Sequence, residues 1–140
     1  MKRGLYQTNP FGEGLAMKRY SDKEILSYIE AVNKGAAQEW ISAFAREPKL
    51  QQTYYWTLFS ELFVRQMQNI PVTMSDAEKL IPQLSASQVR RAIQNAKAAN
   101  YLEVRASGER AKYVLLTPKT EQIIRNTGSK ALTCMEGIFR

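Results

Sequence analysis

The spacing of apolar residues predicts a mainly helical chain that begins with an unusually long helix. Between Ile25 and Phe44 apolar residues recur every three or four positions, which is the period of one helix face. Ser21 stands directly before this stretch in the position of an N-cap. We therefore expect one helix over 22–47, with Gly35 as a weak point in its middle. Such a helix either packs against a second chain or serves as a plain core helix.

The segment 50–70 predicts a second helix that lies at the centre of the domain. Its apolar residues cover more than one helix face, and Pro71 ends the pattern. A short helix follows, capped by Thr73 or by Ser75, and Glu78 has the spacing to complete a capping box with Ser75.

The segment 85–99 predicts a slender helix with a polar outer face. Ser85 and Gln88 have the spacing of a capping box, and Asn100 suits the left-handed conformation at a helix end. Alanine and β-branched residues make up its inner face. The expected buried stripe comprises Val89, Ile93 and Ala96.

Residues 102–117 alternate between apolar and polar around Ser107-Gly108, which predicts a β-hairpin with a charged tip. A last helix opens at Thr117-Pro118 and is expected to end at Gly128. The order helix, short helix, helix, hairpin, helix predicts a winged helix-turn-helix with long N-terminal helices. We divide the chain into a flexible basic arm (1–20), this domain (21–130) and a C-terminal tail (131–140).

Composition argues against an enzyme. The 140 residues include no histidine and a single cysteine, so zinc sites and histidine-based proton transfer are excluded, and we expect neither metal nor cofactor. No paired-carboxylate motif or glycine-rich phosphate loop is present. Cys134 cannot form an internal disulfide and is either an inert thiol or a redox switch. No secretory signal or membrane-spanning run is recognised, so we expect a cytoplasmic protein.

The net charge of +7 is unevenly distributed. Residues 85–117 carry six lysines and arginines against two glutamates, whereas 24–84 carry five against seven acids. A basic segment after a mildly acidic body favours an anionic partner, although the excess could also be an ordinary soluble surface. The arm, with Lys2 and Arg3, either reaches DNA or is disordered.

The helix 85–99 carries the side chains that read DNA bases in a helix-turn-helix. Arginine can bond guanine in two places and glutamine or asparagine can bond adenine, while serine suits phosphate. We predict base contacts from Ser87, Gln88, Arg91 and Gln94. We predict backbone or wing contacts from Ser85, Arg90, Asn95, Lys97, Arg105, Arg110 and Lys112. A solvated amphipathic helix followed by a hairpin is the alternative.

Aromatic residues of the first two helices are candidates for a small-molecule pocket that would hold an effector. They are Trp40, Tyr54, Tyr55, Trp56 and Phe59. The same residues are also typical of a packed core.

Two stretches resemble the winged-helix core of MarR-type bacterial regulators. They are LSASQVRRAIQNAKAANYLEVR, for a recognition helix leading into a wing, and RAKYVLLTPKTEQI, for the second wing strand and the following helix. The resemblance is strongest over 75–127. It implies a homodimer on a pseudo-palindromic double-stranded DNA site, usually as a repressor and often released by a small ligand.

The sequence departs from that family's pattern in several places. Only Arg110 remains of the usual wing-tip acid and arginines, and Asn100 and Thr120 replace customary glycines. The C-terminal helical region is short, so packing around Trp40 is expected to carry more of the dimer interface. We predict a sequence-specific transcriptional repressor that binds through the recognition helix 85–99 and the wing 102–117. The alternative is a winged helix that binds proteins in a replication, phage or chromatin assembly.

Overall fold

The computed structural model describes residues 19–108 and 111–138, so most of the predicted arm and Arg110 lie outside the described residues. The helices are α1 (Asp22–Val32), α2 (Gln38–Ala43), α3 (Thr53–Met67), α4 (Met74–Ala77), α5 (Ala86–Ala98) and α6 (Pro118–Glu136). A π-helix, η2 (Asn33–Ala37), joins α1 to α2, and a 3-10 helix, η3 (Pro48–Gln51), precedes α3. Strands β1 (Leu102–Ser107) and β2 (Ala111–Leu116) form an antiparallel hairpin. This order confirms the predicted winged helix.

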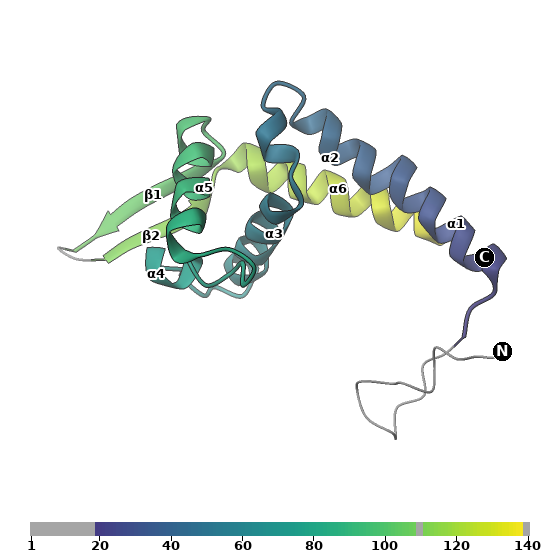
Figure 1. Ribbon diagram of the computed structural model, residues 1–140, viewed down its shortest axis with the longest axis horizontal. Helices are drawn as coiled ribbons and strands as arrows, with labels where there is room; N and C mark the ends of the chain where they lie inside the picture. Colours follow the sequence, from purple (N-terminus) through teal and green to yellow (C-terminus); the bar gives the residue numbers. More distant parts are fainter. Residues whose placement is uncertain (1–18, 109–110, 139–140) are drawn as a thin grey trace, which may run out of the picture.

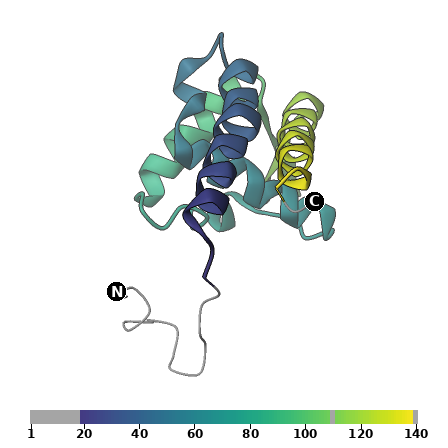
Figure 2. The same ribbon diagram turned by 90° about the vertical axis from the view of Figure 1, so that its right-hand side faces the viewer.

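The long N-terminal helix and α6 lie side by side and project from the rest of the molecule (Figure 1). The body consists of α3, α4, α5 and the hairpin, as Figure 1 and the turned view in Figure 2 show. The predicted helix over 22–47 is present, but it ends at Ala43 and passes through a π-helical stretch. None of the described helices is long and apolar enough to cross a membrane.

Gly35 lies in η2 and is buried against α6. A Cβ atom at this position would lie 2.7 Å from Sγ of Cys134 and 3.4 Å from the Lys130 carbonyl oxygen. Among the glycines that the structure describes, Gly35 has the closest neighbour on another helix. The weak point predicted from the sequence is therefore a place where the two long helices pack tightly together. A side chain at this position would meet the Cys134 sulfur, which would have to move.

The core lies between the long helices and the winged body. Phe44, Leu58 and Phe59 are completely buried, and they pack with the inner face of α5. The three residues of the predicted α5 stripe are all buried: Val89, Ile93 and Ala96. Apolar side chains from α2, α3, α5 and the hairpin thus share one core, which fixes α5 with its opposite face outward.

The sequence offered two N-cap residues for α4, and the structure confirms the first of them. Thr73 is the N-cap: its hydroxyl accepts from the Asp76 amide at 3.1 Å, and the Asp76 carboxylate accepts from the Thr73 amide at 3.2 Å. The hydrogen bond from the Thr73 amide to the carboxylate is the main cause that lowers the pKa of Asp76, and the Thr73 side chain adds to it. The predicted box of Ser75 with Glu78 is wrong, because Glu78 ends α4 and is used elsewhere.

The predicted end of the last helix at Gly128 is wrong, since α6 continues to Glu136. Part of the segment expected to be a tail is therefore helical. A glycine inside a helix costs only about 1 kcal/mol relative to alanine, and packing against α1 and η2 outweighs this cost. The C-terminal helical region is consequently longer than the sequence suggested, and Trp40, expected at a dimer interface, is buried in the core.

We expect Gly35→Ala to lower the midpoint of thermal unfolding, because the new methyl group meets the Cys134 sulfur. In a Cys134→Ala background the same substitution should raise the midpoint, since only the gain in helix propensity of about 1 kcal/mol remains. Circular dichroism melts at one fixed protein concentration measure both effects. A loss of equal size in the two backgrounds would contradict the contact.

Candidate nucleic-acid interface

The outer face of α5 is polar and exposed. All four residues predicted to contact bases are exposed on it: Ser87, Gln88, Arg91 and Gln94. Throughout α5, which the structure describes in full, no large apolar side chain is exposed. This face therefore lacks the apolar patch that a protein-binding recognition helix would present.

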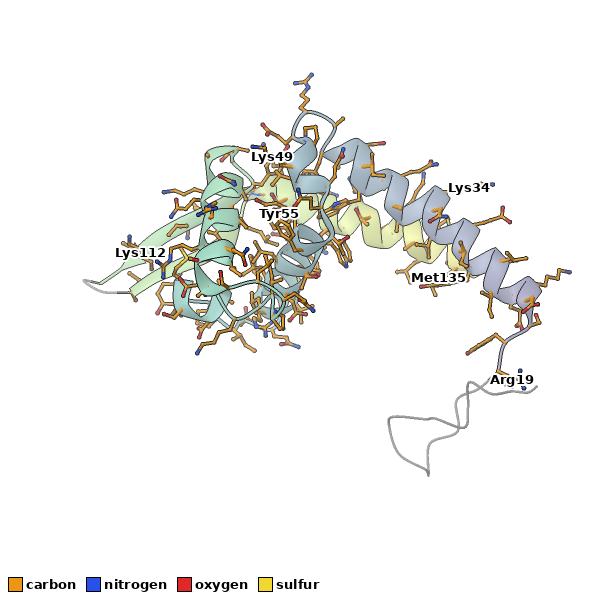
Figure 3. All side chains as sticks on the ribbon, in the orientation of Figure 1. Arg19, Lys34, Lys49, Tyr55, Lys112 and Met135 are labelled. Atoms are coloured by element: carbon orange, nitrogen blue, oxygen red, sulfur yellow. The ribbon has the colours of Figure 1, made fainter. Side chains whose placement is uncertain are left out.

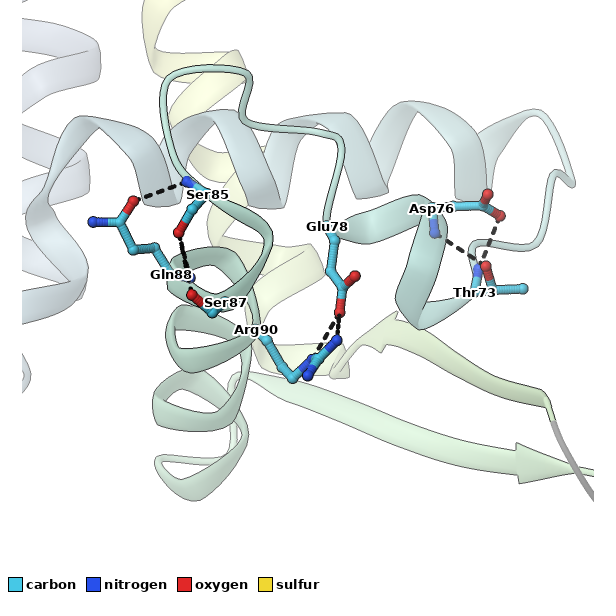
Figure 4. A network of polar contacts seen from close by, with 7 residues as sticks. All are labelled: Thr73, Asp76, Glu78, Ser85, Ser87, Gln88 and Arg90. Carbon is cyan, nitrogen blue, oxygen red and sulfur yellow. Dashed lines mark hydrogen bonds and ion pairs between the residues drawn. The ribbon is translucent and has the colours of Figure 1, made fainter.

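A capping box holds the start of α5, as predicted (Figure 4). The Ser85 hydroxyl accepts from the Gln88 amide at 3.2 Å, and Oε1 of Gln88 accepts from the Ser85 amide at 2.8 Å. The hydroxyl of Ser87 lies 3.2 Å from that of Ser85. The cap engages the side-chain acceptor of Gln88 and leaves its amide nitrogen to donate outward.

Arg90 forms an ion pair that sequence reasoning missed. Its Nη2 lies 2.6 Å from Oε2 of Glu78, and its Nε donates to the same oxygen at 2.7 Å (Figure 4). The pair joins α4 to α5. Spacing along the sequence gave no signal for it, because the two residues lie on different helices joined by a loop.

Tyr55 of α3 holds the middle of α5 from the inside. Its hydroxyl donates to the Ala92 carbonyl oxygen at 3.0 Å, and Figure 3 shows it at the centre of the body. Burial raises the pKa of Tyr55 to about 12, the nearby Tyr54 adds to this rise, and a hydrogen bond with Asn95 opposes it. The phenol therefore stays protonated at neutral pH and remains a donor.

The end of α5 is held by the residues that open α6. Asn100 adopts the left-handed conformation with φ of 68°, as predicted. Lys119 donates to the Ala99 carbonyl at 3.2 Å and lies over the Tyr101 ring. Thr120, where the family pattern has glycine, donates to the Tyr101 carbonyl at 2.6 Å. This departure from the pattern thus adds a buried hydrogen bond just after the end of α5.

The register of the hairpin places its two described basic residues on opposite faces. Arg105 pairs with Tyr113, and Lys112 pairs with Ala106, so the two cations belong to alternate positions of the ladder. Arg105 also forms a 3.0 Å ion pair with Glu103. Lys112 is exposed near the tip of the hairpin, far from the projecting ends of α1 and α6 (Figure 3). The structure thus does not bring these two predicted backbone contacts together.

The predicted aromatic pocket is mostly core. Tyr55 and Phe59 are buried completely or nearly so, and the Trp40 ring lies edge-on to Trp56 with centroids 5.2 Å apart. A cleft of about 440 Å³ lies beside the cluster, and of the five predicted residues only Trp40 and Trp56 line it. The rest of its wall comprises Val32, Ala36, Ala37, Ile41, Gln51, Thr53 and Thr127.

Two residues that line this cleft carry a buried polar atom without a hydrogen-bond partner among the described residues. They are Nε1 of Trp40 and Oγ1 of Thr127, which is 3% exposed as a residue. A buried donor without a partner costs free energy. Sequence reasoning missed Thr127 because it lies on α6, 87 positions beyond Trp40.

The fold was compared with known proteins. No protein-family model matches the chain, and no curated protein matches it in sequence. Several solved structures do match. A mutant of MepR from a multidrug resistant clinical isolate of Staphylococcus aureus has 14% identity and a TM-score of 0.62, covering 86% of this chain and 83% of that one. MepR is a transcription regulator of a multidrug efflux pump.

Two further solved structures of transcriptional regulators also match the fold of this chain. The transcriptional regulator Tm0710 from Thermotoga maritima has 18% identity and a TM-score of 0.56, covering 83% of this chain and 76% of that one. AbsC, a MarR family transcriptional regulator from Streptomyces coelicolor, has 14% identity and a TM-score of 0.50, with coverages of 88% and 82%. The chain therefore has the winged-helix fold of the MarR-type transcription regulators that its sequence resembles.

Proposed function

We propose that the protein is a sequence-specific DNA-binding repressor that binds double-stranded DNA as a homodimer. The observation that carries this proposal is the outer face of α5, which is exposed, presents no large apolar side chain and is held at its start, middle and end. A helix of this kind fits the major groove, where side chains near its N-terminus reach base edges. The similar solved structures are transcription regulators, and we propose no catalytic role and a cytoplasmic location.

The contacts within the protein show which of the residues predicted to contact DNA still have free side-chain donors and acceptors. Arg91 and Gln94 make no ion pair or hydrogen bond through their side chains with the described residues, so both remain available to bases. One lone pair of the Gln88 side-chain oxygen serves the cap, whereas its amide nitrogen is not used there. Gln88 is therefore best placed to donate, which suits guanine or thymine, since both present acceptors in the major groove. Lys97 and Lys112 are exposed and suit phosphates.

The homodimer is supported by the apolar surface of α1. Within α1, which the structure describes in full, no residue is buried. Five large apolar side chains near the projecting end of the two long helices are about half exposed or more: Ile25, Leu26, Tyr28, Ile29 and Leu132. Such a surface on a helix with no fully buried residue favours a second copy as partner. The protein-binding alternative lacks this support on α5.

We further propose that the cleft beside Trp40 binds a small effector. Its wall is mainly apolar and aromatic, contains no charged residue among those that line it, and holds the unpartnered Trp40 and Thr127 atoms. A neutral, flat molecule with one hydrogen-bond acceptor matches these features. The cleft lies next to α3, and α3 bonds α5 through Tyr55, so an occupant could alter DNA binding.

Arg91→Ala should weaken binding to a preferred site by about 1–3 kcal/mol if Arg91 reads a base. Genomic fragments enriched by the wild type and random duplex DNA would both be titrated by fluorescence anisotropy. Equal losses on the two DNAs would show that Arg91 contacts only phosphate. Failure of the wild type to bind any DNA at low salt would refute the proposed function.

Ile25→Asp combined with Ile29→Asp should convert the protein from a dimer to a monomer, because the charges would be buried at the interface. Sedimentation velocity over a range of concentrations measures the change. Val64→Asp is the matched control, since Val64 is 45% exposed like Ile25 but lies on α3. A wild type that sediments as a monomer at all concentrations would contradict the dimer.

Quinoline should bind the cleft about tenfold more tightly than naphthalene, because its ring nitrogen can accept one hydrogen bond. Isothermal titration calorimetry with both probes measures this ratio. Trp40→Phe and Thr127→Val together should abolish the preference, because both remove the polar atom, although only Thr127→Val keeps the volume of the side chain. Equal affinities in the wild type, or no binding of either probe, would argue against the cleft as an effector site.

A further inference from the structure

Arg90 occupies a position where a DNA-binding helix often contacts phosphate, but its guanidinium is already engaged. Nε and Nη2 both approach one oxygen of Glu78, at 2.7 and 2.6 Å. The Glu78 side chain is only 13% exposed, whereas that of Arg90 is 57% exposed. The carboxylate is therefore the buried member of the pair.

This asymmetry favours the ion pair over a phosphate contact. If Arg90 turned to a phosphate, it would leave a largely buried carboxylate without its partner, and such a group is costly. A nearby anionic phosphate would also be repelled by that carboxylate. The pair is neutral as a whole, so it contributes little to the counterion release that drives DNA binding.

Glu78 stands on an element that is itself tied to the wing. The segment before α4 is bonded to β2: the Val114 amide donates to the Val72 carbonyl at 2.9 Å, and Thr73 forms a β-bridge with Tyr113. The Glu78–Arg90 pair extends this connection to α5. The contacts thus run continuously from the wing through α4 to the recognition helix.

We propose that Glu78 and Arg90 are positioning residues, which set the recognition helix relative to the wing, and that Arg90 is not a phosphate ligand. This inference rests on the proposed DNA-binding function. A helix in the major groove and a wing on the flanking backbone must bind at a fixed separation. The ion pair fixes that separation from within the protein.

The test compares variants on a random 25-base-pair duplex over a series of salt concentrations, with fluorescence anisotropy as the readout. Arg90→Met should weaken binding severalfold without changing the slope of log K against log salt. Glu78→Met should also weaken binding, although it removes a negative charge from the DNA-facing side. The double variant should bind about as weakly as either single variant, because the pair that positions the helix is absent in all three and the two losses are therefore not additive.

Lys97→Met is the matched control, since Lys97 lies on the same helix and makes no ion pair with the described residues. For Lys97→Met the slope of log K against log salt should fall in magnitude by about 0.9, the value for one lost phosphate contact. Circular dichroism would verify that each variant keeps its helices. The same fall in slope for Arg90→Met, or wild-type affinity in the double variant, would overturn the inference. A wild type that does not bind the duplex would instead overturn the proposed function.

Discussion

The placement of α5 depends on aromatic packing around Phe44. Phe44 is completely buried where the long N-terminal helix ends, with its ring centroid 4.5 Å from that of Trp40 and 5.1 Å from that of Tyr101. Tyr101 in turn connects α5 to β1, and Phe59 adds a ring from α3 at 6.1 Å from Phe44. Close-packed rings do not shift independently, so the long helix, α3 and the end of α5 behave as one unit.

In addition to this aromatic packing, hydrogen bonds restrain α5 along its whole length. The Ser85 capping box holds its start, the Tyr55 hydroxyl holds Ala92 at its middle, and Lys119 holds its end. Side chains on a helix restrained in this way lose little further freedom when they bind. The same contacts limit what the outer face of α5 can bind, because the side chains of Gln88 and Arg90 already make contacts within the protein. Fewer polar side chains of this face are consequently free for an outside partner than its composition suggests.

The two ends of the molecule present opposite chemistry. The wing and the outer face of α5 are basic and polar, whereas the projecting ends of α1 and α6 expose apolar side chains such as Leu26 and Leu132 (Figure 1). Association through the apolar end would leave both polar faces free. The close approach at Gly35 keeps the two long helices together, so that their apolar side chains form one surface.

The sequence by itself determined the features that depend on neighbouring residues. These include the Ser85–Gln88 cap, the left-handed Asn100, the hairpin turn at Gly108 and the buried stripe of α5. Each follows from hydrogen bonds or side-chain directions within a few positions, which local spacing records. Such patterns show which face of a helix is buried.

Only the tertiary structure decided which residues meet across elements. It paired Arg90 with Glu78, placed Tyr55 against Ala92 and Cys134 against Gly35, and brought Thr127 to the cleft of Trp40. It also decided that α6 continues beyond Gly128 to Glu136. The physical reason is that these contacts depend on how helices pack, and packing is decided by the shape of the whole core, which periodicity along one segment does not encode.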